Sequence, residues 1–413
     1  MVGVRLPRAL TAALASALSV LLITAWAPTS SAAPDPRIDA LVSKRIDHKW
    51  LGDDVGLLAV DAATGEVISD HASGDRMLPA SNMKIVTAVT TLATFAPDHR
   101  FYTQVRAGAT PGELILEGGG EPLLSTTAVR RLANRAAKTI PAGTPVVVHV
   151  DDDLFQDPGL APGWPSGYVP SVVSNVHALA RLWDYSRDPS ANAANVFIKR
   201  LRAKGYQVTL GAPMDAGEAP VIATSKGTSV RDAVRVMLRI SENNVAEVLY
   251  RQVAVATGHP ATWDGSRRAA EAVIAALGID PTGMSLLDGS GLSRNDRVSP
   301  RFLVDVLRVA RVTNPAPFTV MFEDEALPIA GVSGTLDDRY GRFTTKQSRC
   351  AAGVIRAKTG TLHDTIALSG ISLSADGERI FSILVNDRPE RYYPIYTRRA
   401  VDGLAATING CRN

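Results

Sequence analysis

Several features that would mark common protein classes are scarce in this 413-residue sequence. It has only two cysteines, 6% aromatic residues and a formal net charge of +3. Charged residues make up 21% and hydrophobic residues 46%, an ordinary globular composition that excludes a disordered, coiled-coil or collagen-like chain. The near-neutral charge, without basic runs, predicts no nucleic-acid partner. At the usual size of globular domains, the length predicts two or three domains.

The sequence also lacks the motifs of metal and nucleotide sites. Its seven histidines form no His-Glu-x-x-His pattern and its cysteines match no zinc spacing, so we expect no metal and no cofactor. Gly118-Gly119-Gly120 lacks the lysine of a phosphate-binding loop and is predicted to be a tight turn. Lysine is rare, with nine residues against 35 arginines. A lysine at a chemically useful place is therefore less easily explained by chance.

The long apolar run of this chain lies at its N-terminus. Arg5 and Arg8 precede the uncharged stretch 9–34, which has an apolar centre and ends in small residues. This layout is typical of a secretory signal, cleaved here after Ala32, and an uncleaved membrane anchor is the alternative. No later stretch approaches the ~20 apolar residues of a membrane-spanning helix. We therefore expect a secreted, extracytoplasmic protein without a membrane span after cleavage.

Both cysteines, Cys350 and Cys411, remain after such a cleavage. In an exported protein they are expected to form one disulfide that ties down the C-terminal tail. Two free thiols are the alternative.

The remaining chain alternates between regions of predicted helices and regions of short predicted strands. Helical periodicity at 38–51 and 81–95 encloses a hairpin at 55–69, and short strands with Gly/Pro turns follow from about residue 101 to 223. Helices resume at 230, and strands are expected at 353–361, 366–373 and 380–385 before a last helix at 396–408. The predicted fold is α/β, an antiparallel sheet flanked by helices and interrupted by an inserted mixed domain. The expected parts are a signal peptide (1–32), a first core part (33–101), the insert (102–223) and a second core part (224–413).

Ser81 and Lys84 lie three residues apart at the start of a predicted helix. Residues with this spacing share a face, so the amine can approach the hydroxyl. A serine needs a base to become a good nucleophile, and a lysine is a base only if burial or a nearby positive charge lowers its pKa. Lys358 could supply that charge. The pair is thus a candidate nucleophile and base.

Ser241 and Asn243 lie between two predicted helices, where both side chains can point into one cleft. The serine hydroxyl could relay a proton to a leaving nitrogen, and the asparagine amide could hold a substrate amide. Taken alone, this Ser-x-Asn pattern is more often a helix cap.

Lys358, Thr359, Gly360 and Thr361 form a predicted strand at the rim of the cleft. The lysine offers a positive charge to a substrate carboxylate, the threonines offer hydrogen bonds, and the glycine allows close approach of backbone and substrate. The backbone amides of Thr361 and Ser81 are the natural pair for an oxyanion hole. Taken alone, each of the three elements is more often an ordinary structural feature, such as a helix cap or a turn. Together and in this order they are a signature of penicillin-binding proteins and class A β-lactamases.

Asp151-Asp152-Asp153 in the insert is a further candidate. This run of carboxylates could bind a cation. The alternative is that the three aspartates are simply solvated residues at the end of a strand.

Beyond these elements, several segments are similar to one family. They are Leu78-Pro79-Ala80-Ser81, Gly163-Trp164-Pro165, the runs 118–122, 151–155, 288–294 and 331–336, and Lys358-Thr359-Gly360-Thr361-Leu362. With them the chain resembles, over essentially its whole mature length, the D-Ala-D-Ala carboxypeptidase/endopeptidase family of class C low-molecular-mass penicillin-binding proteins. The separation of 160 positions from Ser81 to Ser241 favours this family over β-lactamases. Two departures are Glu242, where the family commonly has aspartate, and an abbreviated stretch from 170 to 223.

The resemblance implies a serine-type D-Ala-D-Ala carboxypeptidase that forms an acyl-enzyme on Ser81. It acts on peptidoglycan stem peptides, with D,D-endopeptidase action as an option, and is acylated by β-lactam antibiotics. Catalytic residues would be Ser81, Lys84, Ser241, Asn243 and Lys358, with Thr359, Gly360, Thr361 and Asp152 binding substrate. The position of the insert in the family suggests that one carboxylate of the run 151–153 recognises the free amine of a stem-peptide side chain. The alternatives are a non-catalytic cell-wall binding protein, or a β-lactamase or D-aminopeptidase of the same fold.

Overall fold

The computed structural model describes residues 36–323 and 326–411, and the expected signal segment, residues 1–32, lies outside them. The helices are α1 (Pro36–Ile46), α2 (Met83–Thr94), α3 (Thr126–Ala136), α4 (Tyr168–Ser171), α5 (Pro189–Arg202), α6 (Val230–Arg239), α7 (Asn243–Ala256), α8 (Trp263–Ala276), α9 (Pro300–Arg308), α10 (Thr319–Phe322) and α11 (Pro394–Ile408). The strands are β1 (Asp54–Asp61), β2 (Val67–His71), β3 (Gln104–Ala107), β4 (Glu113–Glu117), β5 (Val146–Asp151), β6 (Val208–Leu210), β7 (Val221–Thr224), β8 (Ile355–Thr361), β9 (Ile366–Ser374) and β10 (Gly377–Asn386).

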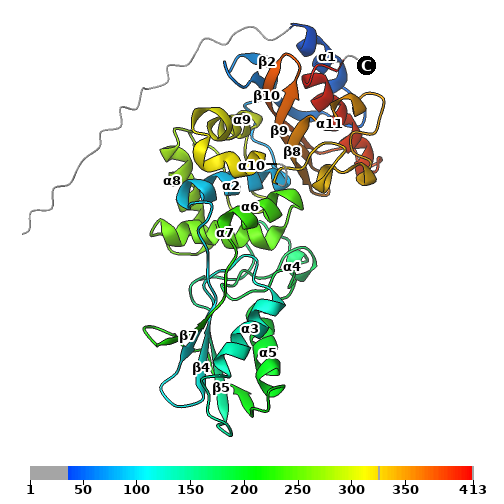
Figure 1. The fold of residues 1–413 in the computed structure, drawn as a ribbon. Coiled ribbons are helices and arrows are strands. Elements are labelled where there is room, and N and C mark those ends of the chain that lie inside the picture. The colour runs from blue at the N-terminus through cyan, green and yellow to red at the C-terminus, as the bar shows by residue number, and fades with distance from the viewer. Residues whose placement is uncertain (1–35, 324–325, 412–413) are drawn as a thin grey trace, which may run out of the picture. The chain divides into compact units, whose positions relative to one another are not determined.

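An antiparallel sheet joins the two ends of the sequence. Its strand order is β2-β1-β10-β9-β8, so β1, from the N-terminal part, pairs with β10, from the C-terminal part, while β9 lies between β10 and β8. β1 and β10 are apolar on both faces, the pattern of strands covered by helices on both sides. The predicted antiparallel sheet flanked by helices is confirmed (Figure 1).

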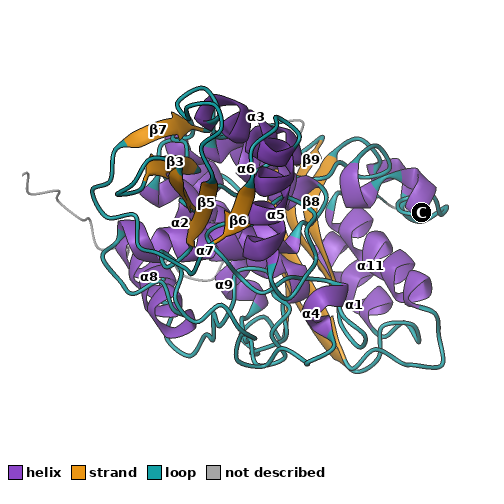
Figure 2. Ribbon diagram, turned by 90° about the horizontal axis from the view of Figure 1, so that it is seen from below, coloured by secondary structure: helices purple, strands orange, loops and turns teal. Residues whose placement is uncertain are grey.

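The two faces of this sheet pack against different helices (Figure 2). On one face, Leu57, Phe381 and Ala357 pack in one cluster with residues of α1 and α11. On the other face, Leu58 and Leu384 pack in a larger cluster with residues of α2, α6, α7, α8 and α9. Because side chains alternate along a strand, neighbouring residues of β8 face different helix layers.

A second sheet is built from residues 104–224, with the order β6-β5-β4-β3-β7. β5 runs parallel to β4 and β6, whereas β3 is antiparallel to β4 and β7, so this sheet is mixed. Val105, Leu116 and Val148 from its strands pack against Val129 of α3 and Phe197 of α5 in a core of their own. This segment contains both strands and helices, as expected for the middle of the chain.

Two element boundaries differ from the sequence-based expectation. Ser81 lies in a 3₁₀ turn, Ala80–Asn82, and the α-helix begins only at Met83. The first helix ends at Ile46 and does not reach Leu51, because the chain turns there to enter β1. The start of α6 is as expected, since the Ser229 side chain accepts a hydrogen bond from the Asp232 amide.

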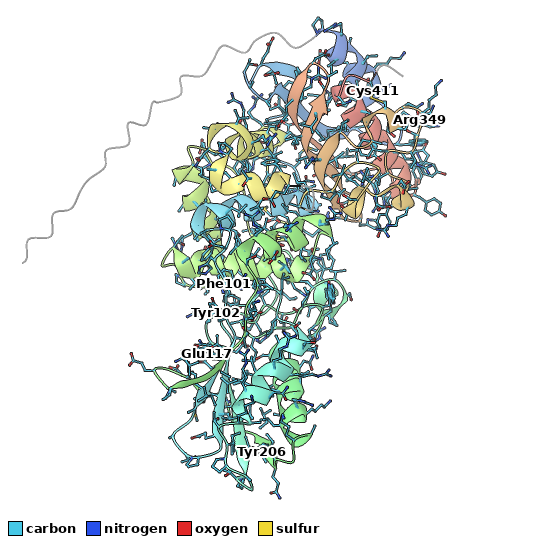
Figure 3. The ribbon with its side chains drawn as sticks, in the orientation of Figure 1. Phe101, Tyr102, Glu117, Tyr206, Arg349 and Cys411 are labelled. Carbon is cyan, nitrogen blue, oxygen red and sulfur yellow. A yellow bond between two sulfur atoms is a disulfide. The ribbon has the colours of Figure 1, made fainter. Side chains whose placement is uncertain are left out.

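The two cysteines form the expected disulfide. Cys350 and Cys411 are bonded to each other, with their Cα atoms 6.3 Å apart. Cys411 follows α11, and Arg349, the neighbour of Cys350, lies close to it in Figure 3. The bond fixes the end of α11 to the segment that leads into β8.

No helix within residues 36–323 and 326–411 has both the length and the apolar character needed to cross a membrane.

Candidate active site

The turn Ala80–Asn82 and the first turn of α2 bring Ser81 and Lys84 together. The Lys84 Nζ lies 3.1 Å from the Ser81 Oγ, within hydrogen-bond distance. Ala80, directly before the serine, is buried and has a φ of +46°, a conformation that a non-glycine residue rarely adopts. The Ala80 carbonyl packs against Gly291, where a Cβ would come within 1.8 Å of its oxygen. This close approach fixes the turn that carries Ser81.

Lys84 is a fully buried amine held by three oxygens. Besides Ser81, its Nζ contacts the Asn243 Oδ1 at 2.8 Å and the Ser290 carbonyl at 2.8 Å. Burial lowers the pKa of Lys84 to about 8, against the opposing field of nearby carboxylates such as Glu247. A useful fraction of this amine is therefore neutral near pH 7, as a general base requires.

Glu247 orders the loop behind Lys84. This buried residue of α7 accepts hydrogen bonds from the Gly289 amide at 2.9 Å and the Ser290 amide at 2.8 Å. Burial raises the pKa of Glu247 to about 8. Ser290 thus presents its carbonyl to Lys84 while Glu247 fixes its amide.

Ser241 lies in the tight link between α6 and α7, and Asn243 is the first residue of α7. Ser241 has a φ of +60°, and Glu242 caps α7 by accepting a hydrogen bond from the Val245 amide at 2.7 Å. Glu242 also accepts from the Tyr185 hydroxyl at 2.7 Å. This departure from aspartate therefore has a structural role in the cap. The Asn243 Nδ2 donates to the Val172 carbonyl at 2.8 Å, which leaves its second N–H for another acceptor.

Lys358 of β8 contacts Ser241 from the other side. Its Nζ lies 2.8 Å from the Ser241 Oγ and 2.8 Å from the Thr359 carbonyl, and the side chain is fully buried. Burial, with added repulsion from Lys84 and Arg342, moves the pKa of Lys358 well below its usual value. Each motif lysine thus lies within hydrogen-bond distance of a motif serine, and Lys84 also contacts Asn243.

Gly360 packs against other residues of the protein, whereas the sequence pattern predicted that the substrate would lie there. A Cβ at this position would lie 2.9 Å from the Asn82 Nδ2 and 3.0 Å from the Pro79 carbonyl. The missing side chain therefore lets β8 pack against the turn that carries Ser81. The close approach expected here is made by the chain's own backbone and side chains.

A cavity of about 270 Å³ opens onto this group. It is lined by Ser81, Ser241, Thr335, Tyr340, Arg342, Thr359, Thr361 and Arg398. The side chains of Thr335 and Thr359 are hydrogen-bonded at 2.7 Å, and the Arg342 side chain forms a buried ion pair with Asp402 at 2.6 Å. Lys84 and Lys358 are not lining residues of this cavity; they lie behind the two serines.

Four of these lining residues were not predicted from the sequence. Thr335 lies in the segment 331–336, which resembles the family and could have been examined as a candidate. The sequence gives no signal for the other three, because nothing in the local pattern of Tyr340, Arg342 or Arg398 indicates a site. Arginine is also common in this chain, so the two arginines do not stand out.

Asp152 lies apart from this cavity. It lines a separate cavity of about 700 Å³ together with Asp151, Asp153 and other residues of the segment 150–215. Its carboxylate accepts a hydrogen bond from the Leu179 amide at 2.6 Å and pairs with His177. Both carboxylate oxygens thus already have partners in the chain.

Within the described residues, no group of three or more His, Cys, Asp or Glu side chains is arranged to hold a metal ion.

Comparison with known proteins gives concordant results. The family model of the D-Ala-D-Ala carboxypeptidase 3 (S13) family matches residues 38–176 and 166–408. Carboxypeptidase DacB of Mycolicibacterium smegmatis is 31% identical over 411 residues, covering 93% of this chain and 87% of that protein. D-alanyl-D-alanine carboxypeptidase of an Actinomadura species is 27% identical, covering 80% of this chain and 77% of that protein.

The fold also has a solved counterpart. The crystal structure of penicillin binding protein 4 from Haemophilus influenzae matches with a TM-score of 0.75 and 21% identity, covering 89% of this chain and 97% of that one. This likeness supports the α/β fold with its inserted segment, and the family model and the mycobacterial relative extend over nearly all of the described chain. The chain belongs to the D-Ala-D-Ala carboxypeptidase 3 (S13) family.

Proposed function

We propose that Ser81 is the nucleophile of this serine-type D-Ala-D-Ala carboxypeptidase and that Lys84 is its base. The observation that carries the proposal is the 3.1 Å contact between the Ser81 Oγ and a buried Lys84 amine whose pKa burial lowers to about 8. The neutral amine takes the hydroxyl proton as the oxygen attacks the carbonyl carbon of the penultimate D-alanine. The backbone amides of Ser81 and Thr361 would bind the oxyanion.

Ser241 is the proton relay in this proposal. Its hydroxyl lies 2.8 Å from the Lys358 Nζ and lines the same cavity as Ser81. As the C–N bond breaks, the proton held by Lys84 passes through the Ser241 hydroxyl to the leaving nitrogen of the terminal D-alanine. Lys358 fixes the orientation of that hydroxyl, and Asn243 offers its remaining N–H to a substrate amide. Water, deprotonated by Lys84, then hydrolyses the ester on Ser81.

The substrate proposed here is a peptidoglycan stem peptide that ends in D-Ala-D-Ala. Thr359 and Thr361 line the cavity and offer hydroxyls to the terminal carboxylate. Hydrolysis of a cross-link at the same serine would be D,D-endopeptidase action. A β-lactam would acylate Ser81 by the same attack, since its strained amide takes the place of the scissile peptide bond.

The division of the chain is also a proposal. Residues 33–101 and 224–413 would form the catalytic domain, and 102–223 would form an insert with its own sheet and core. Residues 1–32 would be a cleaved signal that exports the enzyme to the bacterial cell envelope. Asp152 would help the insert recognise an amine-bearing side chain, which requires that it exchange its present partners for the substrate.

The proposal is tested with Ser81→Ala and a labelled penicillin. The wild-type protein is expected to carry one covalent label and to release D-alanine from stem peptides, whereas Ser81→Ala does neither. Label on Ser81→Ala would refute the assignment of the nucleophile. Labelling of the wild type without D-alanine release would favour a non-catalytic binding protein, and loss of the adduct within minutes would favour a β-lactamase.

A further inference from the structure

The last residues of β8 divide their side chains between the two helix layers. Ile355 and Ala357 pack in the cluster formed with α1 and α11. By strand alternation, Thr359 and Thr361 lie on that same face, and Lys358 and Gly360 lie on the face toward Ser81 and α2. The contacts agree, because Lys358 reaches Ser241 whereas Thr361 contacts a residue of α11.

Lys358 is therefore poorly placed to supply positive charge beside the threonine hydroxyls. Its fully buried amine is engaged by the Ser241 hydroxyl and the Thr359 carbonyl, both at 2.8 Å. It is not among the residues that line the cavity. A substrate carboxylate bound between Thr359 and Thr361 needs another cation.

Two arginines line the cavity on the α11 side, and they differ in how their charge is neutralised. Arg342 is 4% exposed and forms a two-point ion pair with Asp402, with contacts of 2.6 and 3.0 Å. Arg398, on α11, is partly buried, and its Nη2 lies 3.3 Å from the Thr361 Oγ1. In the described part of the chain, no carboxylate lies within ion-pair distance of the Arg398 guanidinium.

We propose that Arg398 binds the terminal carboxylate of the substrate, together with the hydroxyls of Thr359 and Thr361, and so sets the requirement for a free C-terminus. The planar guanidinium presents several N–H donors in a fork that matches a carboxylate. This inference deepens the proposed function and rests on it.

The surroundings of Arg398 favour an anion at this place. Burial, with repulsion from Arg342, lowers the pKa of Arg398 against the opposing field of Asp402, so its charge is held at a cost that a bound carboxylate would offset. Asp402 does not fill that place, because it is bonded to Arg342 and to the Phe343 amide at 3.0 Å. Arg342 and Asp402 thus form an ion pair beside Arg398, the lining arginine that has no carboxylate within ion-pair distance among the described residues.

The test uses two ligands that differ only in this charge, benzylpenicillin and its methyl ester. Acylation of Ser81 by the free acid is expected to slow about 10- to 100-fold in Arg398→Gln, the range of a lost charged hydrogen bond, while the ester slows much less. Arg398→Lys should recover part of the loss. Arg399→Gln, the next residue of the same helix and not a lining residue of the cavity, is the matched control and should retain the preference for the acid.

The outcomes separate this inference from the proposed function. If Arg398→Gln keeps the wild-type preference for the free acid, the assignment of Arg398 is wrong, whatever the peptidase activity. If both penicillins slow equally in Arg398→Gln, the residue supports the fold and does not bind the carboxylate. If the preference is lost but no variant or wild type releases D-alanine from peptides, Arg398 stands as an anion site and the peptidase proposal falls.

Discussion

At the scale of single residues, the chemistry depends on how burial sets the charge of Lys84. Burial lowers its pKa, and the fields of Glu247, Asp288 and Glu242 act in the opposite direction. The result, a pKa of about 8, is low enough for a base near neutral pH and high enough for the protonated amine to donate later. Sequence spacing predicts that Lys84 meets Ser81, but burial among the surrounding helices gives the amine a pKa that suits the base proposed here.

This pKa gives a prediction for the pH dependence of acylation. Only the neutral form of Lys84 can take the proton of Ser81, so the second-order rate of acylation by a penicillin should rise about tenfold per pH unit up to pH 7 and about fivefold from pH 7 to pH 8. Above about pH 8.5 the rate should level off. Stopped-flow measurement from pH 6 to 9, with enzyme-free hydrolysis subtracted, checks this. A rate that is flat across this range would contradict the assignment of Lys84 as the base.

At the scale of elements, β8 contributes to two different groups of side chains, because its residues alternate between the two faces of the sheet. Lys358 and Gly360 face the Ser81 turn, and Thr359 and Thr361 face α11. The sequence motif was interpreted as one rim that faces the substrate. The strand is instead shared, with one face organising the serines and the other facing the cavity beside Arg398.

The packing of β8 on the Ser81 turn can be tested with Gly360→Ala. The new Cβ would lie 2.8 Å from the Ala367 Cβ and 3.0 Å from the Pro79 carbonyl, closer than ordinary contacts allow. We expect β8 and the turn to separate slightly, with a loss of about 1–3 kcal/mol in the free energy of unfolding. Acylation by penicillin should slow at the same time.

The matched control is Gly403→Ala in α11. No atom outside its own helix backbone lies within 4 Å of the Cβ that would be added there. Alanine in a helix interior is favoured over glycine by about 0.5–1 kcal/mol, so this variant should be as stable as the wild type or more so. Chemical denaturation and acylation rates of the two variants, measured side by side, check both. Equal behaviour would show that β8 does not need a glycine at Gly360.

At the scale of the whole molecule, the sheet brings distant parts of the sequence into one site. β1 pairs with β10, and Ser81 lines the same cavity as Ser241, which contacts Lys358. Ser81 and Lys358 are 277 positions apart in the sequence. The segment 102–223 leaves and rejoins this core between α2 and α6. The disulfide adds a further long-range constraint, since it fixes α11, which carries Arg398, to the segment before β8.

The contribution of the disulfide can be predicted from the loop that it closes. Cys350 and Cys411 are 61 residues apart, and closing a loop of that length reduces the entropy of the unfolded chain by an amount equivalent to about 4 kcal/mol. The double variant Cys350→Ser and Cys411→Ser should therefore unfold at a clearly lower denaturant concentration. Reduced wild-type protein is the control and should behave like the double variant. An unchanged midpoint in both would show that the folded state gains nothing from this bond.

The sequence by itself determined the main features of this protein. The order Ser81–Lys84, Ser241–Asn243 and Lys358–Thr361 indicated the site, because each motif is local and its spacing sets which side chains share a face or a turn. Apolar periodicity likewise predicted the antiparallel sheet and most of its helices. The signal-like N-terminus indicated an exported protein, and this predicted the pairing of Cys350 with Cys411.

Tertiary structure alone decided where charge is available. Arg398 and Arg342 look the same as the other 33 arginines in the sequence, but Asp402 neutralises one and leaves the other beside Thr361. Similarly, the role of Gly360 depends on Pro79 and Asn82, which lie far away in the chain. Burial, ion pairing and close packing arise between elements that are distant in sequence, so no local pattern encodes them.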